Sequence, residues 1–189
     1  MKGVPMNKAH ADLALLRFKG VADDLGLDWC LFAGSALGMF RDGHWIAHDD
    51  DIDVAVIASP EGLEKLWPAL YEAGFNLGRW CENVDGTKNR HVYYHPDIPH
   101  IQDGGILVDV FYTFTQDEEN LTRFFDGVPY KNELYLVPHP IQAYLQLAYG
   151  EWWDKENRNA AVGKEGVESL VFQLSGYARN ILEGSQLGH

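Results

Sequence analysis

The fold is decided by a short acidic segment, HDDDIDV at residues 48–54. It places four aspartates at the head of an apolar, β-branched run that continues to Ile57. Alternate side chains of a strand point to opposite faces, so Asp51 and Asp53 share one face. Their carboxylates then lie about 6.5 Å apart along the strand. At an effective dielectric constant of ~20, two charges at that separation repel each other by roughly 2–3 kcal/mol.

A cation would relieve this repulsion. Hard divalent ions take oxygen ligands, and Mg²⁺ commonly binds one or two carboxylates together with substrate phosphates. We therefore interpret Asp51 and Asp53 as ligands of Mg²⁺ or Mn²⁺, with Asp49, on the same face, as a further candidate. The alternative is an acidic turn at a strand end that only faces solvent.

A second feature lies upstream, in the stretch FAGSALG at residues 32–38. Here a predicted strand runs into Gly34 and Ser35 and opens a short helix. Backbone N–H groups and a serine hydroxyl at such a turn approach a phosphate closely. Arg41, on the helix that follows, could reach a phosphate with its planar guanidinium. The alternatives are an ordinary strand-to-helix turn and a surface cation.

A third acid, Asp109, is embedded in the apolar stretch GILVDVF at residues 105–111. A carboxylate buried there without a partner would cost several kcal/mol, roughly the penalty for an unpaired polar group. A cation shared with the other acids would remove that cost. The alternative is an acid on an edge strand that faces solvent.

Together these three features resemble the nucleotidyltransferase superfamily that includes polymerase beta. Two longer stretches, GSALGMFR at 34–41 and GHWIAHDDDIDV at 43–54, are similar to its LicD and fukutin-like branch. The segments VDVF at 108–111, LVPHP at 136–140 and YGEW at 149–152 fit the later motifs of that branch. The resemblance covers roughly residues 31–153.

The resemblance implies a metal-dependent transferase with two Mg²⁺ or Mn²⁺ ions. Asp51, Asp53 and Asp109 would be the catalytic and metal-binding residues, and Gly34, Ser35 and Arg41 would bind the nucleotide phosphates. In the LicD-like branch, a phospho-alcohol such as phosphocholine passes from a CDP-alcohol to a hydroxyl of a sugar-containing acceptor. In other relatives, an NTP gives its NMP to an acceptor, which here would be a small molecule. A non-catalytic nucleotide-binding module is the third hypothesis.

Composition restricts the partners. The 189 residues hold 15 Lys and Arg against 28 Asp and Glu, a net charge of -13, which disfavours binding to duplex nucleic acid. No apolar stretch approaches the ~20 residues that span a bilayer, and no secretory signal is visible. We therefore expect a cytoplasmic protein without a transmembrane segment.

Cys30 and Cys81 lie among apolar and aromatic neighbours and are expected to be buried free thiols.

The pattern of apolar residues predicts one domain over 1–189, with a core at about 8–153 and a C-terminal helical tail at 154–189. We expect an α/β (α+β) fold, in which a mixed sheet is flanked by helices. The expected helices are 8–25, 36–41, 59–73, 140–149 and 166–182. The expected strands are 28–33, 52–57, 75–80, 91–94 and 106–114, with weaker candidates at 121–130 and 133–136 and a hairpin turn at Asp85–Gly86.

Overall fold

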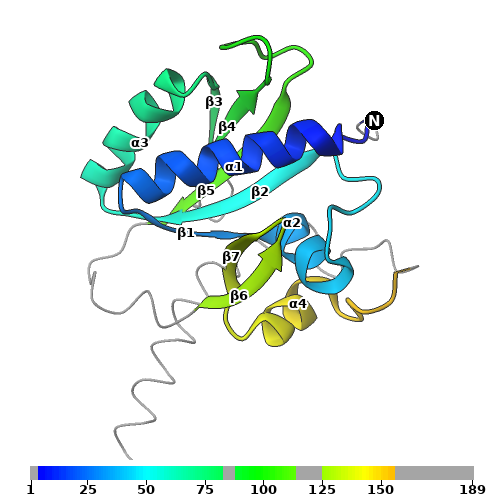
Figure 1. The fold of residues 1–189 in the computed structure, drawn as a ribbon. Helices are drawn as coiled ribbons and strands as arrows, with labels where there is room; N and C mark the ends of the chain where they lie inside the picture. The colour runs from blue at the N-terminus through cyan, green and yellow to red at the C-terminus, as the bar shows by residue number, and fades with distance from the viewer. Residues whose placement is uncertain (1–3, 83–87, 114–124, 156–189) are drawn as a thin grey trace, which may run out of the picture.

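The computed structural model describes residues 4–82, 88–113 and 125–155 (Figure 1). The elements follow in this order: α1 (Lys8–Asp24), β1 (Asp28–Leu31), α2 (Ala33–Leu37), a π-helical turn η1 (Gly38–Asp42), β2 (Asp51–Ile57), α3 (Pro60–Glu72), β3 (Asn76–Glu82), β4 (Lys88–Tyr94), β5 (Ile106–Thr113), β6 (Phe125–Tyr130), β7 (Glu133–Pro138) and α4 (Ile141–Tyr149).

Within the described residues, five strands form one mixed sheet in the order β1-β2-β5-β4-β3. Strands β2 and β5 pair in parallel, and the remaining neighbours pair antiparallel. A separate hairpin, β6–β7, contacts the main sheet through β1 and β7. The predicted class, a mixed sheet flanked by helices, is therefore confirmed.

Helices α1 and α3 contact each other and pack on one side of the sheet, whereas α2, α4 and the β6–β7 hairpin lie on the other side (Figure 1). The apolar side chains of β2 face the core, and both Ile52 and Val54 are fully buried. By alternation, the aspartates of the same strand point away from these buried residues. The segregation of apolar and acidic faces along β2 places the acidic face opposite the packed core.

Several predicted boundaries shift. The expected strand at 28–33 ends at Leu31, because the chain turns into α2 at Ala33, which has a positive φ of 38°. The expected helix at 36–41 is α2 followed by η1. Strand β4 begins at Lys88 rather than at 91. The predicted Asp85–Gly86 turn, the 166–182 helix and residues 121–124 lie outside the described residues. Within the described ranges, no helix is long and apolar enough to cross a membrane.

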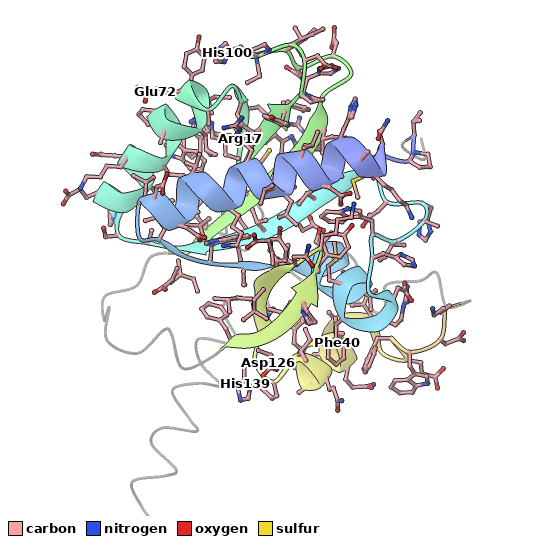
Figure 2. The ribbon with its side chains drawn as sticks, viewed as in Figure 1. Arg17, Phe40, Glu72, His100, Asp126 and His139 are labelled. Atoms are coloured by element: carbon pink, nitrogen blue, oxygen red, sulfur yellow. The ribbon has the colours of Figure 1, made fainter. Side chains whose placement is uncertain are left out.

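Helix α4 is fixed to the hairpin by Asp126, which lies on β6. Asp126 Oδ2 accepts the backbone N–H of Ile141 at 2.9 Å, and the Nδ1 atom of His139 lies 2.9 Å from Oδ1. Figure 2 shows Asp126 and His139 side by side at the end of the hairpin. The hydrogen bond satisfies one of the orphan N–H groups at the start of α4.

Asp12 joins three distant segments. Its Oδ1 accepts hydrogen bonds from Trp45 Nε1 at 2.8 Å and from the Tyr130 hydroxyl at 2.6 Å. Its Oδ2 accepts from Lys131 Nζ. Trp45 is only 1% exposed, so its indole N–H depends on this carboxylate. One side chain of α1 thereby ties the segment before β2 to the hairpin.

Replacing Asp12 by alanine is expected to lower the free energy of unfolding by about 2–3 kcal/mol, because the buried indole of Trp45 and the half-buried hydroxyl of Tyr130 lose a charged acceptor. Asp12→Asn keeps one acceptor oxygen and should cost less. Urea denaturation of both variants and of the wild type measures the difference. An unfolding free energy within about 0.5 kcal/mol of the wild type for Asp12→Ala would contradict a structural role for this carboxylate.

Candidate active site

The acidic face of the sheet collects three carboxylates from two neighbouring strands. Asp51 and Asp53 lie on β2 and Asp109 on β5, and Asp53 stands directly opposite Asp109 in the parallel register. One oxygen from each of the three lies within 4.8 Å of the others. Asp109 is only 4% exposed and lies on a strand with neighbours on both sides. The alternative of a solvent-facing acid on an edge strand is therefore wrong.

Asp53 is the most constrained of these acids. Its Oδ2 accepts the backbone N–H of Gly34 at 3.0 Å, and its own backbone N–H donates to Ser35 Oγ at 2.9 Å. Burial raises the pKa of Asp53 well above its ordinary value, and the charges of Asp51, Asp49 and Asp109 raise it further. The Gly34 hydrogen bond opposes the shift only in part. In the metal-free protein, this carboxylate is therefore costly to ionise.

Asp49 extends the acidic face beyond β2. Oxygens of Asp49, Asp50 and Asp51 lie within 4.8 Å of one another. Burial, followed by the charges of Asp51 and Asp50, raises the pKa of Asp49 to about 7. Its Oδ2 is buried and has no hydrogen-bond partner among the described residues. Such an oxygen costs free energy unless a ligand meets it.

Gly34 lies against these carboxylates. A Cβ atom at this position would lie 3.0 Å from Asp49 Oδ2 and 3.3 Å from Asp53 Oδ2. The absence of a side chain therefore lets the turn between β1 and α2 approach the acids of β2. The turn is also held from the other side, because the backbone N–H of Ala33 donates to the Tyr144 hydroxyl at 2.9 Å.

Ser35 and Arg41 make internal contacts that the sequence did not predict. Ser35 is only 1% exposed, and its hydroxyl accepts the Asp53 N–H, so it ties α2 to β2. Arg41 is paired with its neighbour Asp42 through Nη2 at 2.7 Å and Nε at 3.1 Å. Its Nη1 donates to the carbonyl of Trp152 at 3.2 Å. Phosphate contacts by Gly34, Ser35 and Arg41 remain predictions.

Two polar residues of β4 complete the acidic face and were missed by sequence reasoning. Asn89 donates from Nδ2 to Asp109 Oδ1 at 2.5 Å, and His91 Nε2 lies 3.6 Å from Asp109 Oδ2. His91 also lies beside Cys81 of β3, with 3.7 Å between Nε2 and Sγ. Asn89 and His91 are two residues apart, a spacing that places two side chains on the same face of a strand. The predicted strand began only at residue 91, so this signal was not used. Cys30 is a buried free thiol, as expected, whereas Cys81 is free but only half-buried, so the expectation of a buried thiol is wrong for Cys81.

Tyr149, at the end of α4, is a third missed neighbour of the acids. Burial raises the pKa of its hydroxyl, and the charges of Asp53, Asp49 and Asp51 raise it further. The phenol is therefore neutral and keeps its proton. The chain brings this aromatic ring to the acidic face because α4 packs beside the turn that holds Gly34.

The donor set fits a hard divalent cation. It consists of carboxylate oxygens at mutual distances that one ion or a pair of ions can bridge, and it includes the unpartnered Asp49 Oδ2. Asp51, Asp53 and Asp109 would be the ligands, with Asp49 beside them. Like charges held this closely repel each other, and a cation between them would offset that repulsion.

Comparison with known proteins gives structural neighbours alone, since no protein-family model and no curated protein matches the sequence. The solution structure of the antibiotic-resistance factor ANT(2'')-Ia matches with a TM-score of 0.52 and 18% identity, covering 97% of this chain and 100% of that chain. The structure of ANT(2'')-Ia in complex with adenylyl-2''-tobramycin gives 0.47 and 16%, covering 92% and 90%.

A structure of the Cid1 poly(U) polymerase bound to MgATP gives a TM-score of 0.40 and 10% identity. That match covers 58% of this chain and 34% of the polymerase, so the present chain spans about a third of the polymerase's length. At these identities, the match to the solution structure of ANT(2'')-Ia shows that the two chains share a fold, and it shows neither the activity nor the substrate. The β2–β5 pair, the acids on it and the turn at Gly34 belong to a chain that has the nucleotidyltransferase fold.

Proposed function

We propose that this protein transfers a nucleotidyl group from a nucleoside triphosphate to a hydroxyl of a small molecule. The observation that carries the proposal is the convergence of Asp51, Asp53 and Asp109 beside the turn at Gly34. Phosphoryl transfer depends mainly on positioning and on charge stabilisation, and this cluster would supply both once it is loaded with cations.

The roles of the residues follow from their places on the sheet. Asp51 and Asp53 of β2 would hold Mg²⁺ or Mn²⁺ together with Asp109 of β5, and the bound ions would neutralise the phosphate oxygens. The turn at Gly34 lies on the β1 side of these acids, and Asp109 lies on the β4 side. A donor phosphate at the turn and an acceptor hydroxyl beside Asp109 would therefore meet from opposite sides of the phosphorus.

In the proposed step, the acceptor oxygen attacks the α-phosphorus and the bond from that phosphorus to the bridging oxygen breaks. Pyrophosphate leaves, and the hydroxyl proton passes to Asp109 or to solvent. The Asp53–Gly34 and Ser35–Asp53 hydrogen bonds would keep the turn and the acids in register during this displacement. The half-buried, protonated Tyr149 would shield the site from water on the α4 side.

The small-molecule acceptor is supported by two further facts. A chain with a net charge of -13 disfavours a nucleic-acid acceptor, whereas it attracts a cationic small molecule. A neighbour that aligns over its full length is an antibiotic-resistance factor, and that protein has been captured with adenylyl-2''-tobramycin, a nucleotidylated amino sugar. A compound of this chemical class is the first acceptor to test.

Transfer of a phospho-alcohol from a CDP-alcohol is the second candidate. It is favoured by the resemblance of residues 34–54 to the LicD-like branch, and the same three acids would serve it. In that reaction the acceptor oxygen attacks the phosphate that bears the alcohol, and CMP leaves. The two reactions therefore differ in the leaving group, which can be measured directly.

The test incubates the protein and Mg²⁺ or Mn²⁺ with each of the four NTPs, CDP-choline, CDP-ribitol or CDP-glycerol, and with tobramycin as a hydroxyl-bearing amino sugar. Release of pyrophosphate with an acceptor mass gain of one NMP supports nucleotidyl transfer. Release of CMP supports the CDP-alcohol reaction. Thermal-shift measurements accompany it, since a ligand at 100 times its Kd adds about 2.7 kcal/mol. Stabilisation by nucleotides without turnover of any donor would indicate the non-catalytic module.

A further inference from the structure

Asn89 is the buried partner of Asp109, and it lies on the opposite side of Asp109 from the other two acids. Strand β4 pairs antiparallel with β5, with His91 opposite Asp109 and Asn89 opposite Phe111. Asn89 is 5% exposed, and its Nδ2 donates to Asp109 Oδ1. Because β4 is separated from β2 by β5, Asn89 reaches the acidic cluster through Asp109.

Packing does not explain an amide at this position. The Oδ1 atom of Asn89 is buried, and it accepts no hydrogen bond within the part of the chain that the structure describes. A buried carbonyl without a donor costs stability, and leucine, whose side chain has the same number and branching of heavy atoms, would avoid that cost. The benefit of the amide therefore lies in what its other end does, which is to hold Asp109.

Asp109 needs such a hold because it faces another acid. Asp53 is its direct neighbour in the register, and like charges at opposed positions of two strands repel each other. A carboxylate that is free to rotate would turn away from Asp53. Asn89 on Oδ1 and His91, 3.6 Å from Oδ2, instead give each oxygen of Asp109 a partner on β4.

We infer that Asn89 is a positioning residue: it holds the Asp109 carboxylate in the orientation in which one of its oxygens lies within 4.8 Å of oxygens of Asp51 and Asp53, so that the three acids form a cation site. This inference rests on the proposed function, because it concerns the same site. Residues that hydrogen-bond a metal-binding carboxylate commonly change metal affinity or activity by about 10–100-fold when they are removed.

The test compares Mn²⁺ binding by the wild type, Asn89→Leu and Asn89→Gln, measured by electron paramagnetic resonance without any nucleotide. Asn89→Leu should bind Mn²⁺ about 10–100-fold more weakly, and circular dichroism of the metal-free protein should show that the fold is kept. Asn89→Gln keeps an N–H donor and should recover part of the affinity. Asn76→Leu is the matched control, since Asn76 of β3 donates to the His100 carbonyl, away from the acids.

Wild-type Mn²⁺ affinity in a folded Asn89→Leu protein would overturn the inference and leave the proposed function intact. An equal loss in Asn76→Leu would also overturn it, because the effect would then belong to the sheet as a whole. If Asn89→Leu does not fold, Asn89→Ala decides the question, because it also removes the N–H donor to Asp109, and wild-type Mn²⁺ affinity in that variant would overturn the inference. Failure of the wild type to bind Mn²⁺ would overturn the proposed function and this inference with it.

Discussion

Replacing Asp53 by asparagine is expected to abolish transfer and to stabilise the metal-free protein at the same time. Asp53 is the acid with contacts to both the Gly34 turn and the register partner of β5. Loss of one preorganised charged group at a reacting phosphate costs roughly 10²–10³-fold or more in rate. We expect turnover to fall by at least that factor.

The gain in stability has a separate cause. A carboxyl whose pKa is raised in the folded protein destabilises the fold once the unfolded chain ionises, which occurs above about pH 4. The pKa of Asp53 is raised by burial and by three neighbouring carboxylates, so at neutral pH this group opposes folding. Asparagine has no charge, and its side-chain oxygen can still accept the Gly34 N–H. The melting temperature of the metal-free protein should therefore rise.

Asp24→Asn is the matched control for the change in net charge, since Asp24 is an exposed residue at the end of α1, outside the acidic face. It should leave both activity and melting temperature close to the wild type. Turnover and thermal unfolding are measured on the same preparations. Full activity of Asp53→Asn would show that transfer does not depend on a metal site formed by the acids of β2 and β5. A large fall in its melting temperature would show instead that Asp53 is mainly structural.

The parts of the site that could be predicted from the sequence are those set by local alternation. The Asp51–Ile57 strand and the face shared by Asp51 and Asp53 follow from a period of two within one segment. The apolar stretch around Asp109 predicts a buried strand in the same way. Placing that strand beside β2 required the resemblance to nucleotidyltransferases, and the structure agrees with it.

The parts that could not be predicted depend on register and on pairs distant in the chain. Asn89 belongs to a polar run, Lys88–Arg90, that lacks the apolar alternation of a half-buried strand. Only its pairing with β5 brings it to Asp109. Arg41 looked like a free cation because sequence spacing does not show that it pairs with its neighbour Asp42. The Ser35 hydroxyl likewise looked available, whereas β2 uses it as an acceptor.

The metal-free protein is expected to lose stability as the pH rises from about 4 to about 7, and Mg²⁺ is expected to restore it. At low pH, Asp49 is protonated in both the folded and the unfolded chain, so it has no effect. Between its unfolded pKa and its folded value of about 7, the unfolded chain ionises while the folded one stays protonated. Unfolding is then favoured increasingly, to an upper bound of roughly 4 kcal/mol for this group.

At lower pH, the titration of Asp42 has the opposite effect on stability. Arg41 holds the pKa of Asp42 at about 2, so Asp42 stabilises the fold above about pH 4 and loses that effect only as the pH falls toward 2. The range from about 5 to about 8 therefore reports mainly on the acids of the site. Because the pKa of Asp53 is also raised, the unfolding free energy of the metal-free protein continues to fall at higher pH.

Urea denaturation across that range, with a chelator or with saturating Mg²⁺, measures both parts of the prediction. With chelator, the unfolding free energy should fall as the pH rises. With Mg²⁺ the curve should be flat or rising, because a cation favours the ionised carboxylates and, at 100 times its Kd, adds about 2.7 kcal/mol. The double variant Asp49→Asn/Asp53→Asn should show neither the pH-dependent loss nor the response to Mg²⁺. A flat curve for the metal-free wild type, or a wild type indifferent to Mg²⁺, would mean that these carboxylates do not form a cation site.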